Sequence, residues 1–367
     1  MKRILCIAAL CALLAGCGPV LSGVYVNIQP HEDQGDRNQS DTIMASDYRM
    51  LCGVMEDLVT AGTERAVINV GEYDQEAIAR DMGYAVRYVR QDFPLGAYAV
   101  EEISYEIGRS GGIPAISVEV SYLHGRLELR RIRAVSDMEA AAAEIGEALR
   151  DCETGLVLSV EQYEETDFAQ LVADYADENP HIVMETPQVA AGLYPEEGTS
   201  RILELSFTYQ TSRESLRQMR SQIQPVFSAA TLYVSGGGSE FQKYNQLFAL
   251  LKERHDYTLE TSITPAYSLL THGVGDSKAF ATVYSAMCRQ AGLQCHVITG
   301  TRDGAPWCWN MIYDEGYYCH VDLLRSSEAG RLTEMMDGQM TGYVWDYSAY
   351  PVASGQYEPP TEETTDP

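Results

Sequence analysis

The sequence has 367 residues and a net charge of −27, from 26 Lys and Arg against 53 Asp and Glu. No basic stretch stands out, so the composition disfavours nucleic-acid binding. Acidity of this strength favours solubility and weakens contact with anionic cell-wall polymers.

Residues 1–16 predict a secretory signal peptide. Lys2 and Arg3 precede an apolar run, Ile4–Leu14, that is too short to span a membrane. The run ends in LAGC, residues 14–17, which resembles the bacterial lipoprotein signal. That resemblance implies cleavage before Cys17 and acylation of this cysteine, for example with palmitate. We therefore expect a protein anchored by lipid to the extracytoplasmic face of the cell membrane. An ordinary signal peptide with a chance cysteine is the alternative.

A polar tether, residues 17–45, precedes a region in which helical and strand patterns alternate. A Ser/Asp cap and spaced apolar residues predict a first helix over Ser46–Gly62. A His124–Gly125 turn between two apolar runs suggests a hairpin. The remaining expected elements are strands at Ala66–Val70, Ala115–Leu123 and Arg126–Val135, and helices at Asp74–Val89 and Ser136–Cys152.

This pattern restarts within residues 46–235. VINVGEYDQEA near residue 70 is similar to VLSVEQYEETD near residue 160, and ISVEVSY near 119 is similar to LELSFTY near 205. Both pairs are separated by roughly 85 to 90 residues, which is typical of a tandem repeat. We interpret the region as two copies of one α/β unit, with a chance match as the alternative.

SGGGSE, residues 235–240, predicts a flexible joint and a domain boundary. Beyond it, residues 240–351 form a second predicted domain, and residues 352–367 form an acidic, Pro-rich tail that predicts disorder. The second domain has a helix at Phe280–Ala291, ended by Gly292, and three following strands that begin at Cys295, Trp307 and Tyr317.

The second domain resembles the bacterial transglutaminase-like domain, a branch of the papain-like cysteine enzymes, over Phe241–Pro351. The residues that carry the resemblance are Ala266, Tyr267, Leu270, Gly273, Gly275, Phe280, Ala281, Gly292, Trp309, Asn310, Gly316, Val321 and Asp322. It implies an α+β fold in which a helix packs on an antiparallel sheet, after the tandem α/β region.

The family's catalytic triad is Cys, His and Asp, and its positions here are Ser277, Trp307 and Asp322. A serine hydroxyl is un-ionised near neutral pH and needs a general base, whereas an indole offers a donor N–H and no basic lone pair. Losing one triad member commonly costs on the order of 10⁴-fold in rate. The resemblance therefore implies a triad that is degenerate.

His320 is the one substitute base that strand parity allows, because it lies two residues from Asp322 on the same strand. Cys308 and Cys319 have the opposite parity and should face away from Ser277, and His272 and His296 are weaker candidates. His320 and Asp322 lack a third ligand for a metal site, so we expect no metal and no cofactor.

Structural roles explain the same residues without a reaction. Ser277 or Asp276 can cap the helix, and Asp322 can accept backbone or indole hydrogen bonds. Trp307 and Trp309 share a face of their strand, so we expect Trp309 and Tyr318 to line a ligand groove, with core packing as the alternative.

The prediction is a surface-anchored, monomeric lipoprotein whose inactive transglutaminase-like domain binds peptide-like or wall-derived ligands. One alternative is an active hydrolase or acyltransferase that uses Ser277, His320 and Asp322. A second alternative is a scaffold lipoprotein that acts through its N-terminal repeats. Six cysteines remain after the signal and Cys17, and the sequence assigns them no pairing.

Overall fold

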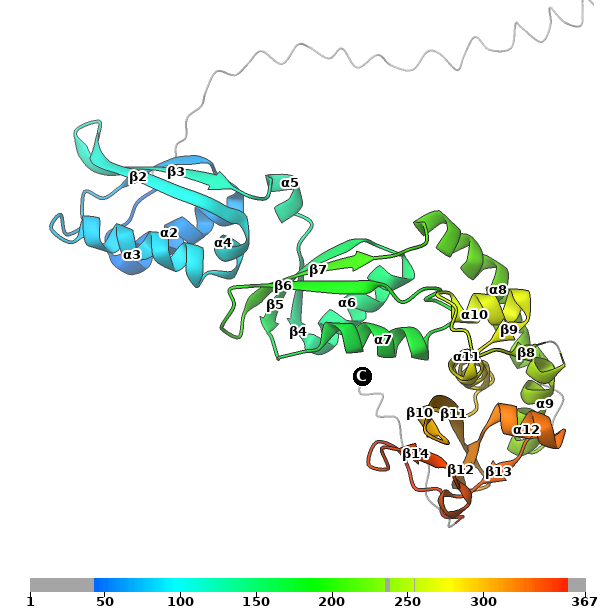
Figure 1. Cartoon of the computed structure of the whole chain (residues 1–367). Helices are drawn as coiled ribbons and strands as arrows, with labels where there is room; N and C mark the ends of the chain where they lie inside the picture. Colours follow the sequence, from blue (N-terminus) through cyan, green and yellow to red (C-terminus); the bar gives the residue numbers. More distant parts are fainter. Residues whose placement is uncertain (1–42, 235–237, 254, 356–367) are drawn as a thin grey trace, which may run out of the picture.

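The computed structural model describes residues 43–234, 238–253 and 255–355. The predicted signal peptide, Cys17, most of the tether, residues 235–237 of the joint and residues 356–367 lie outside this part of the chain. The described residues form a mixed α+β structure of three parts that follow one another along the chain (Figure 1).

The first part packs helices on one face of an antiparallel sheet with strand order β1-β3-β2. Asp47 accepts a hydrogen bond from the Met50 N–H at 2.9 Å and so begins the first helix, as the Ser/Asp cap predicted. The apolar faces of two helices and the sheet enclose one core. The elements are α2 (Tyr48–Ala61), β1 (Arg65–Asn69), α3 (Ile78–Gln91), α4 (Pro94–Ala99), β2 (Val100–Ser110) and β3 (Ile113–Tyr122).

The second part has a four-stranded sheet with strand order β4-β5-β7-β6, and its helices also enclose a core on one face. Asp137 caps its first long helix by accepting from the Ala140 N–H at 2.9 Å. The elements are α5 (Arg126–Leu129), β4 (Arg133–Asp137), α6 (Met138–Arg150), β5 (Gly155–Gln162), α7 (Phe168–Glu178), β6 (Gln188–Tyr194) and β7 (Arg201–Thr208).

Apart from α4, which lies between α3 and β2 in the first part, the series from α2 to β3 and from α6 to β7 share the order helix–strand–helix–strand–strand, and the last strand is central in both sheets. The offset of β5 from β1 is 90 residues (155 − 65), and that of β7 from β3 is 88 (201 − 113). The parallel bridge Met44–Asn69 also has its counterpart in the parallel pair Ala134–Ser159. The similar segments of the sequence therefore occupy equivalent strands.

The predicted hairpin at His124–Gly125 is wrong. The hairpin joins β2 and β3 instead, through Gly111 and Gly112, whose φ angles of 57° and 85° suit a tight turn. The run Arg126–Val135 is not one strand. Its first residues form α5, where the Glu128 carboxylate accepts from the Gly125 N–H at 2.7 Å, and its last residues enter β4.

The long helix α8 (Arg213–Tyr233) packs into the C-terminal core through Leu216, Ile223 and Phe227. The C-terminal core therefore begins before residue 240. The predicted joint placed the start of the second domain at residue 240. Side chains of Arg213 and Arg217 donate to the Asp151 carbonyl at the end of α6, so α8 also holds the second part. Among the described helices, none is both long enough and apolar enough to cross a membrane.

The C-terminal core contains a five-stranded antiparallel sheet with strand order β13-β12-β11-β10-β14. The predicted strands after the central helix are present. The elements after α8 are α9 (Glu240–Lys252), β8 (Asp256–Tyr257), α10 (Pro265–Tyr267), a π-helical turn (Ser268–His272), β9 (Val274–Gly275), α11 (Ser277–Gln290), β10 (Cys295–Arg302), β11 (Ala305–Asp314), β12 (Tyr317–Val321), α12 (Leu323–Ala329), β13 (Glu334–Met335), a 3₁₀ turn (Asp337–Gln339) and β14 (Tyr343–Trp345).

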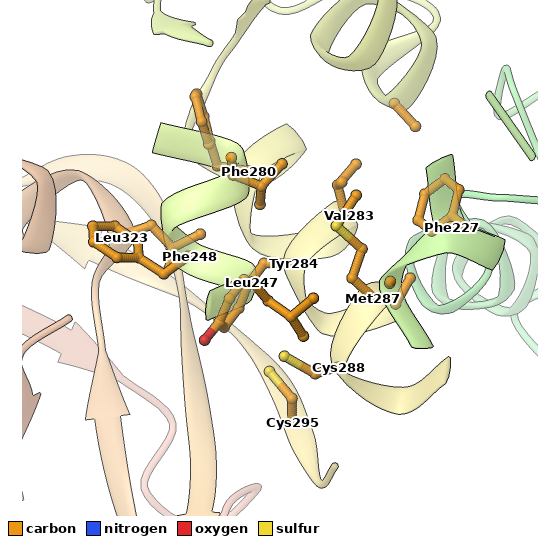
Figure 2. Packing of buried hydrophobic residues seen from close by; sticks show 14 of the residues in the cluster. Phe227, Leu247, Phe248, Phe280, Val283, Tyr284, Met287, Cys288, Cys295 and Leu323 are labelled. Atoms are coloured by element: carbon orange, nitrogen blue, oxygen red, sulfur yellow. The ribbon is translucent and has the colours of Figure 1, made fainter. Parts of the chain in front are cut away.

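Helix α11 is buried on nearly all sides, with every residue from Ala279 to Cys288 buried. Figure 2 shows its side chains between those of α8 and α9 and the sheet. The Asn310 side chain of β11 donates to the Ala281 carbonyl of α11 at 2.9 Å. This helix is therefore fixed against the sheet, and its first residue is held beside β11.

Candidate functional site at the triad positions

Ser277 is the first residue of α11, and Asp276 is the residue that caps the helix. The Asp276 carboxylate accepts from the Ala279 N–H at 2.8 Å and from the Thr261 hydroxyl at 2.8 Å. Ser277 is 9% exposed, and its Oγ accepts from the Cys308 N–H at 3.2 Å. Ser277 is therefore the acceptor in this hydrogen bond. The Cys308 N–H is a donor and cannot take the hydroxyl proton from the serine.

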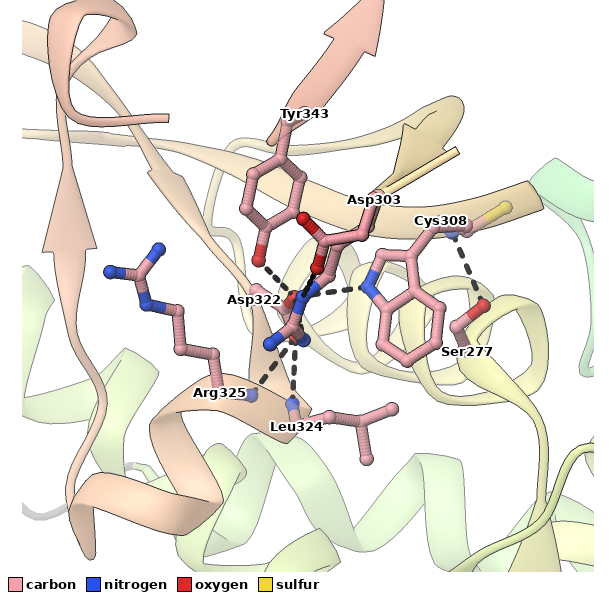
Figure 3. Close-up of polar contacts among 9 residues, drawn as sticks. Ser277, Asp303, Cys308, Asp322, Leu324, Arg325 and Tyr343 are labelled. Atoms are coloured by element: carbon pink, nitrogen blue, oxygen red, sulfur yellow. Dashed lines mark hydrogen bonds and ion pairs between the residues drawn. The ribbon is translucent and has the colours of Figure 1, made fainter. Parts of the chain in front are cut away.

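Trp307 and Asp322 lie in direct contact, as the triad positions predict. The Trp307 indole Nε1–H donates to Asp322 Oδ2 at 2.9 Å (Figure 3). In a Cys-His-Asp triad, the aspartate accepts a hydrogen bond from the histidine that it orients. Here the indole supplies that donor, but it has no second nitrogen that could take a proton from Ser277.

The Asp322 carboxylate is 1% exposed and accepts from donors on both oxygens. Oδ1 binds the N–H groups of Leu324 and Arg325, at the start of α12, at 2.9 and 3.2 Å. Oδ2 accepts from Trp307, from Arg302 at 3.2 Å and from the Tyr343 hydroxyl at 2.6 Å. A buried carboxylate is stable only when it is paired and hydrogen-bonded, and these contacts meet that condition.

Arg302, at the end of β10, supplies the charge that balances Asp322. Its side chain is 24% exposed, and its guanidinium lies over the Trp307 ring at 5.2 Å and over the Tyr343 ring at 5.6 Å. Burial, together with the hydrogen bond to Asp322, raises the pKa of Tyr343, so this phenol stays protonated and donates. Neither Arg302 nor Tyr343 was predicted as part of the site.

His320 is not placed to act as a base for Ser277, which corrects the prediction of a substitute base. It is fully buried, and its Nδ1 accepts from the Trp309 indole N–H at 3.0 Å. Its Nε2 lies 2.8 Å from Asp337 Oδ1, so the neutral ring carries its proton on Nε2 and donates it there. Burial lowers the pKa of His320, while Asp337 partly opposes this shift. Both ring nitrogens are therefore engaged away from Ser277.

Trp309 and Tyr318 do not line a groove, contrary to the prediction. They are 0% and 1% exposed and lie in a core on the face of the sheet that carries Trp307. Strand parity correctly placed Trp309 on the same face as Trp307, but the C-terminal segment covers that face there. Its covering residues include Met335, Met340, Tyr343, Trp345 and Ala353.

The remaining candidates also have other surroundings. Cys308 contacts Ser277 through its backbone N–H, and its thiol lies 3.8 Å from the Thr299 hydroxyl. Burial raises the pKa of both the Cys308 and the Cys319 thiols, which disfavours the nucleophilic thiolate. The His272 ring packs edge-on against Tyr267, and the exposed His296 ring lies near Tyr318.

Residues 228–323 match the family model described as the transglutaminase-like superfamily. The C-terminal core is a transglutaminase-like domain. The matched segment includes Ser277, Trp307 and Asp322, so the resemblance read from the sequence motifs is confirmed at the level of the domain.

Solved structures of low similarity include a proposed cysteine protease from Cytophaga hutchinsonii, at 13% identity and a TM-score of 0.26 over 40% of this chain and 65% of that one. A second is described as a TGase, at 11% identity and a TM-score of 0.26 over 70% of this chain and 73% of that one. The chain thus spans just under two thirds of the first of these proteins. No curated protein matches the sequence.

A cavity of ≈ 720 Å³ lies away from the triad positions, between the two N-terminal parts. Tyr98 and His124 stack on one of its sides with ring centroids 4.2 Å apart. Its charged lining residues are Arg131, Arg133, Arg213, Glu128, Glu153 and Glu204. Across the described residues, no three His, Cys, Asp or Glu side chains are grouped to hold a metal ion.

Proposed function

We propose that this protein is a surface lipoprotein whose transglutaminase-like domain binds peptide-like or cell-wall-derived ligands without catalysing a reaction on them. The observation that carries the proposal is the hydrogen bond from the Trp307 indole to Asp322. It fills the position of the base with a group that accepts no proton.

The loss of catalysis follows from the chemistry of the two altered positions. The dipole of a helix stabilises a negative charge at its start by about 1 kcal/mol, which is far too little to ionise a serine hydroxyl near neutral pH. Serine needs a base within hydrogen-bond reach, and His320 is engaged by Trp309 and Asp337. The family's reaction would therefore lack both its thiolate and its base.

The aromatic surface around Trp307 supports a binding role. Trp307 is half-buried, and the ring of Tyr257, which is 39% exposed, lies 5.5 Å from it. The Arg302 guanidinium lies over the rings of Trp307 and Tyr343. Partly exposed aromatic rings such as Trp307 and Tyr257, beside an arginine, are typical of surfaces that bind peptides and other polar ligands with apolar parts.

The location of the protein is part of the same proposal and rests on the sequence of its first residues. The charged start, the short apolar run and the LAGC segment support cleavage before Cys17 and a lipid anchor there. The acyl chains would hold the protein at the extracytoplasmic face of the membrane, where wall-derived peptides are present. We propose that it acts there as a monomer.

Titration of the purified protein with soluble cell-wall fragments, prepared by muramidase digestion, tests both parts of the proposal. We expect heat of binding in calorimetry, weakened at least about fivefold by Trp307→Ala because a central aromatic contact is worth more than about 1 kcal/mol. Trialanine serves as a second, simpler peptide probe.

Chromatography of the same mixtures after long incubation tests catalysis, with Ser277→Ala as the matched control. We expect the wild-type protein and the control to give identical traces. A product that forms with the wild-type protein and not with Ser277→Ala would contradict the inactive domain. Binding that is equal in wild type and Trp307→Ala would contradict the proposed surface.

A further inference from the structure

Two buried cysteines lie side by side behind the site. Cys288 is in the last turns of α11, and Cys295 is the first residue of β10. They are 0% and 4% exposed, and their thiols are within hydrogen-bonding distance of each other. Figure 2 shows the two sulfur atoms next to each other at the edge of the core.

The connection between α11 and β10 fixes both residues. Gly292 adopts a φ of 75°, and the Leu293 N–H returns to the Cys288 carbonyl at 2.9 Å, which ends the helix in a tight turn. The Ser285 hydroxyl donates to the Cys295 carbonyl at 2.7 Å. The two sulfur atoms are therefore brought together by local backbone structure rather than by chance contact of mobile side chains.

The other described cysteines have different neighbours. The Cys52 thiol interacts with the Tyr48 hydroxyl, Cys308 with the Thr299 hydroxyl, and Cys319 with the Glu334 carboxylate at 3.6 Å. Cys152 lies in the interface between α8 and the second part of the chain. Within the described residues, Cys288 and Cys295 are thus the two thiols that face each other.

We propose that Cys288 and Cys295 form an intramolecular disulfide when the chain folds in the presence of a disulfide oxidant. One cysteine thiolate attacks the oxidant's S–S bond and forms a mixed disulfide, which releases one thiolate of the oxidant. The second cysteine then attacks the mixed disulfide, which forms the Cys288–Cys295 bond and releases the other thiolate. Two protein thiols lose two protons and two electrons, and the oxidant becomes two thiols.

The bond must form before the core closes. Burial raises the pKa of Cys288 well above its ordinary value, so the folded thiol is protonated and shielded from the oxidant. The two cysteines are seven residues apart in the chain, so they meet early, while α11 and the following turn form. The proposal is independent of the proposed function, because neither thiol touches the triad positions.

Trypsin offers a direct test, because Arg289 separates the two cysteines. Cleavage after Lys278, Arg289 and Arg302 yields residues 279–289 and 290–302, each with one cysteine. The reduced, purified protein is refolded with glutathione disulfide and glutathione, alkylated with iodoacetamide in denaturant, and digested. We expect mass spectrometry to find the two peptides joined, and to find them apart after reduction.

Recovery of both peptides in alkylated form from the refolded, unreduced sample would overturn the proposal, as would joining of either peptide to the one that carries Cys308 and Cys319.

Cys288→Ser is the control, and it must release the 290–302 peptide. If that variant fails to fold, thermal unfolding of the wild type decides: the protein refolded with glutathione disulfide should melt higher than the same protein refolded and kept in a reductant, by several degrees, on the order of 5 °C. Equal melting temperatures would also count against it.

Discussion

Two tryptophans on one strand, Trp307 and Trp309, meet two different polar groups on the same face of the sheet. Trp307 donates to Asp322, and Trp309 donates to His320, which in turn donates to Asp337. Asp322 accepts hydrogen bonds on both of its oxygens, one of them from the Arg302 guanidinium. His320 has one partner on each ring nitrogen. Both Asp322 and His320 therefore accept a hydrogen bond from an indole, but Asp322 has five donors, against the two partners of His320.

The largest expected difference is between the losses of unfolding free energy when Asp322 and when Asp337 is replaced by alanine. Asp322→Ala leaves Arg302, whose side chain is only 24% exposed, without this partner and leaves the buried Tyr343 hydroxyl without its acceptor. It should lower the free energy of unfolding by about 3 kcal/mol. Asp337→Ala removes a partly exposed carboxylate and should cost clearly less. Urea unfolding of the two variants measures this. Equal losses would show that the Asp322 pocket is not specially stabilised.

Replacing each tryptophan by phenylalanine compares how much each indole hydrogen bond contributes to the free energy of unfolding. Trp309→Phe leaves the buried Nδ1 of His320 without a donor and should cost about 1–3 kcal/mol of unfolding free energy, with a further loss from the cavity. Trp307→Phe is the matched control, because Asp322 keeps four donors and Trp307 is only half-buried. A larger loss for Trp307→Phe would contradict this ranking.

The His320 pocket should contribute to the pH dependence of stability. Burial lowers the pKa of His320 in the folded protein, so the unfolded chain binds more protons once the pH falls below the ordinary pKa of histidine. The contribution of neutral His320 to stability is therefore complete above that pH and is lost as the pH falls toward the lower, folded pKa. The slope for one proton is at most about 1.4 kcal/mol for each pH unit.

Urea midpoints measured between pH 8 and pH 5 for the wild type and His320→Gln isolate this term from the other histidines, among them His181, whose pKa is also lowered by burial. The wild type should lose more stability than the variant over this range. Parallel curves for the two proteins would show that His320 does not titrate as the geometry requires.

The smallest expected effect concerns one donor of Asp322. Tyr343→Phe removes a hydrogen bond of 2.6 Å but leaves Arg302 and three other donors in place. We expect a loss of about 1 kcal/mol in unfolding free energy. Thermal unfolding with calorimetry checks this value, and a loss as large as that of Asp322→Ala would mean that the tyrosine, not the arginine, holds the carboxylate.

The sequence predicted the framework of the site well, because its signals are local. Helix α11 and the strands that carry Trp307 and Asp322 follow from periodic patterns that are read in windows of roughly 11–18 residues. The transglutaminase-like resemblance follows from motifs between Ala266 and Asp322. The suggestion that Asp322 accepts an indole hydrogen bond is confirmed by the contact with Trp307. Parity also placed Trp307 and Trp309 on one face.

The parts that the sequence did not predict depend on segments that are distant in the chain. Arg302 and Tyr343 reach Asp322 from β10 and β14, and no local pattern ties them to it. Parity indicates a face of a strand but not what covers it, so it could not decide between the predicted groove and the core packing that was the alternative for Trp309. Gly300 gave one signal: a Cβ there would lie 2.2 Å from the Val344 carbonyl, so the glycine allows β14 to pair closely beside β10.

The edge strand β2 was missed for a related reason. It pairs along only one side, most of its residues are exposed, and its burial does not alternate cleanly. The turn at Gly111–Gly112 was the better hairpin signal, since two adjacent glycines both adopt positive φ there.

Covalent labelling of Ser277 tests most directly whether the triad positions are inert. The purified wild-type protein is incubated with a fluorophosphonate, which reacts with serines that a neighbouring base activates, and its intact mass is measured over time. The account predicts an unchanged mass, equal to that of Ser277→Ala treated in the same way. An adduct on the wild type that Ser277→Ala lacks would show that a base serves this serine and would contradict the account.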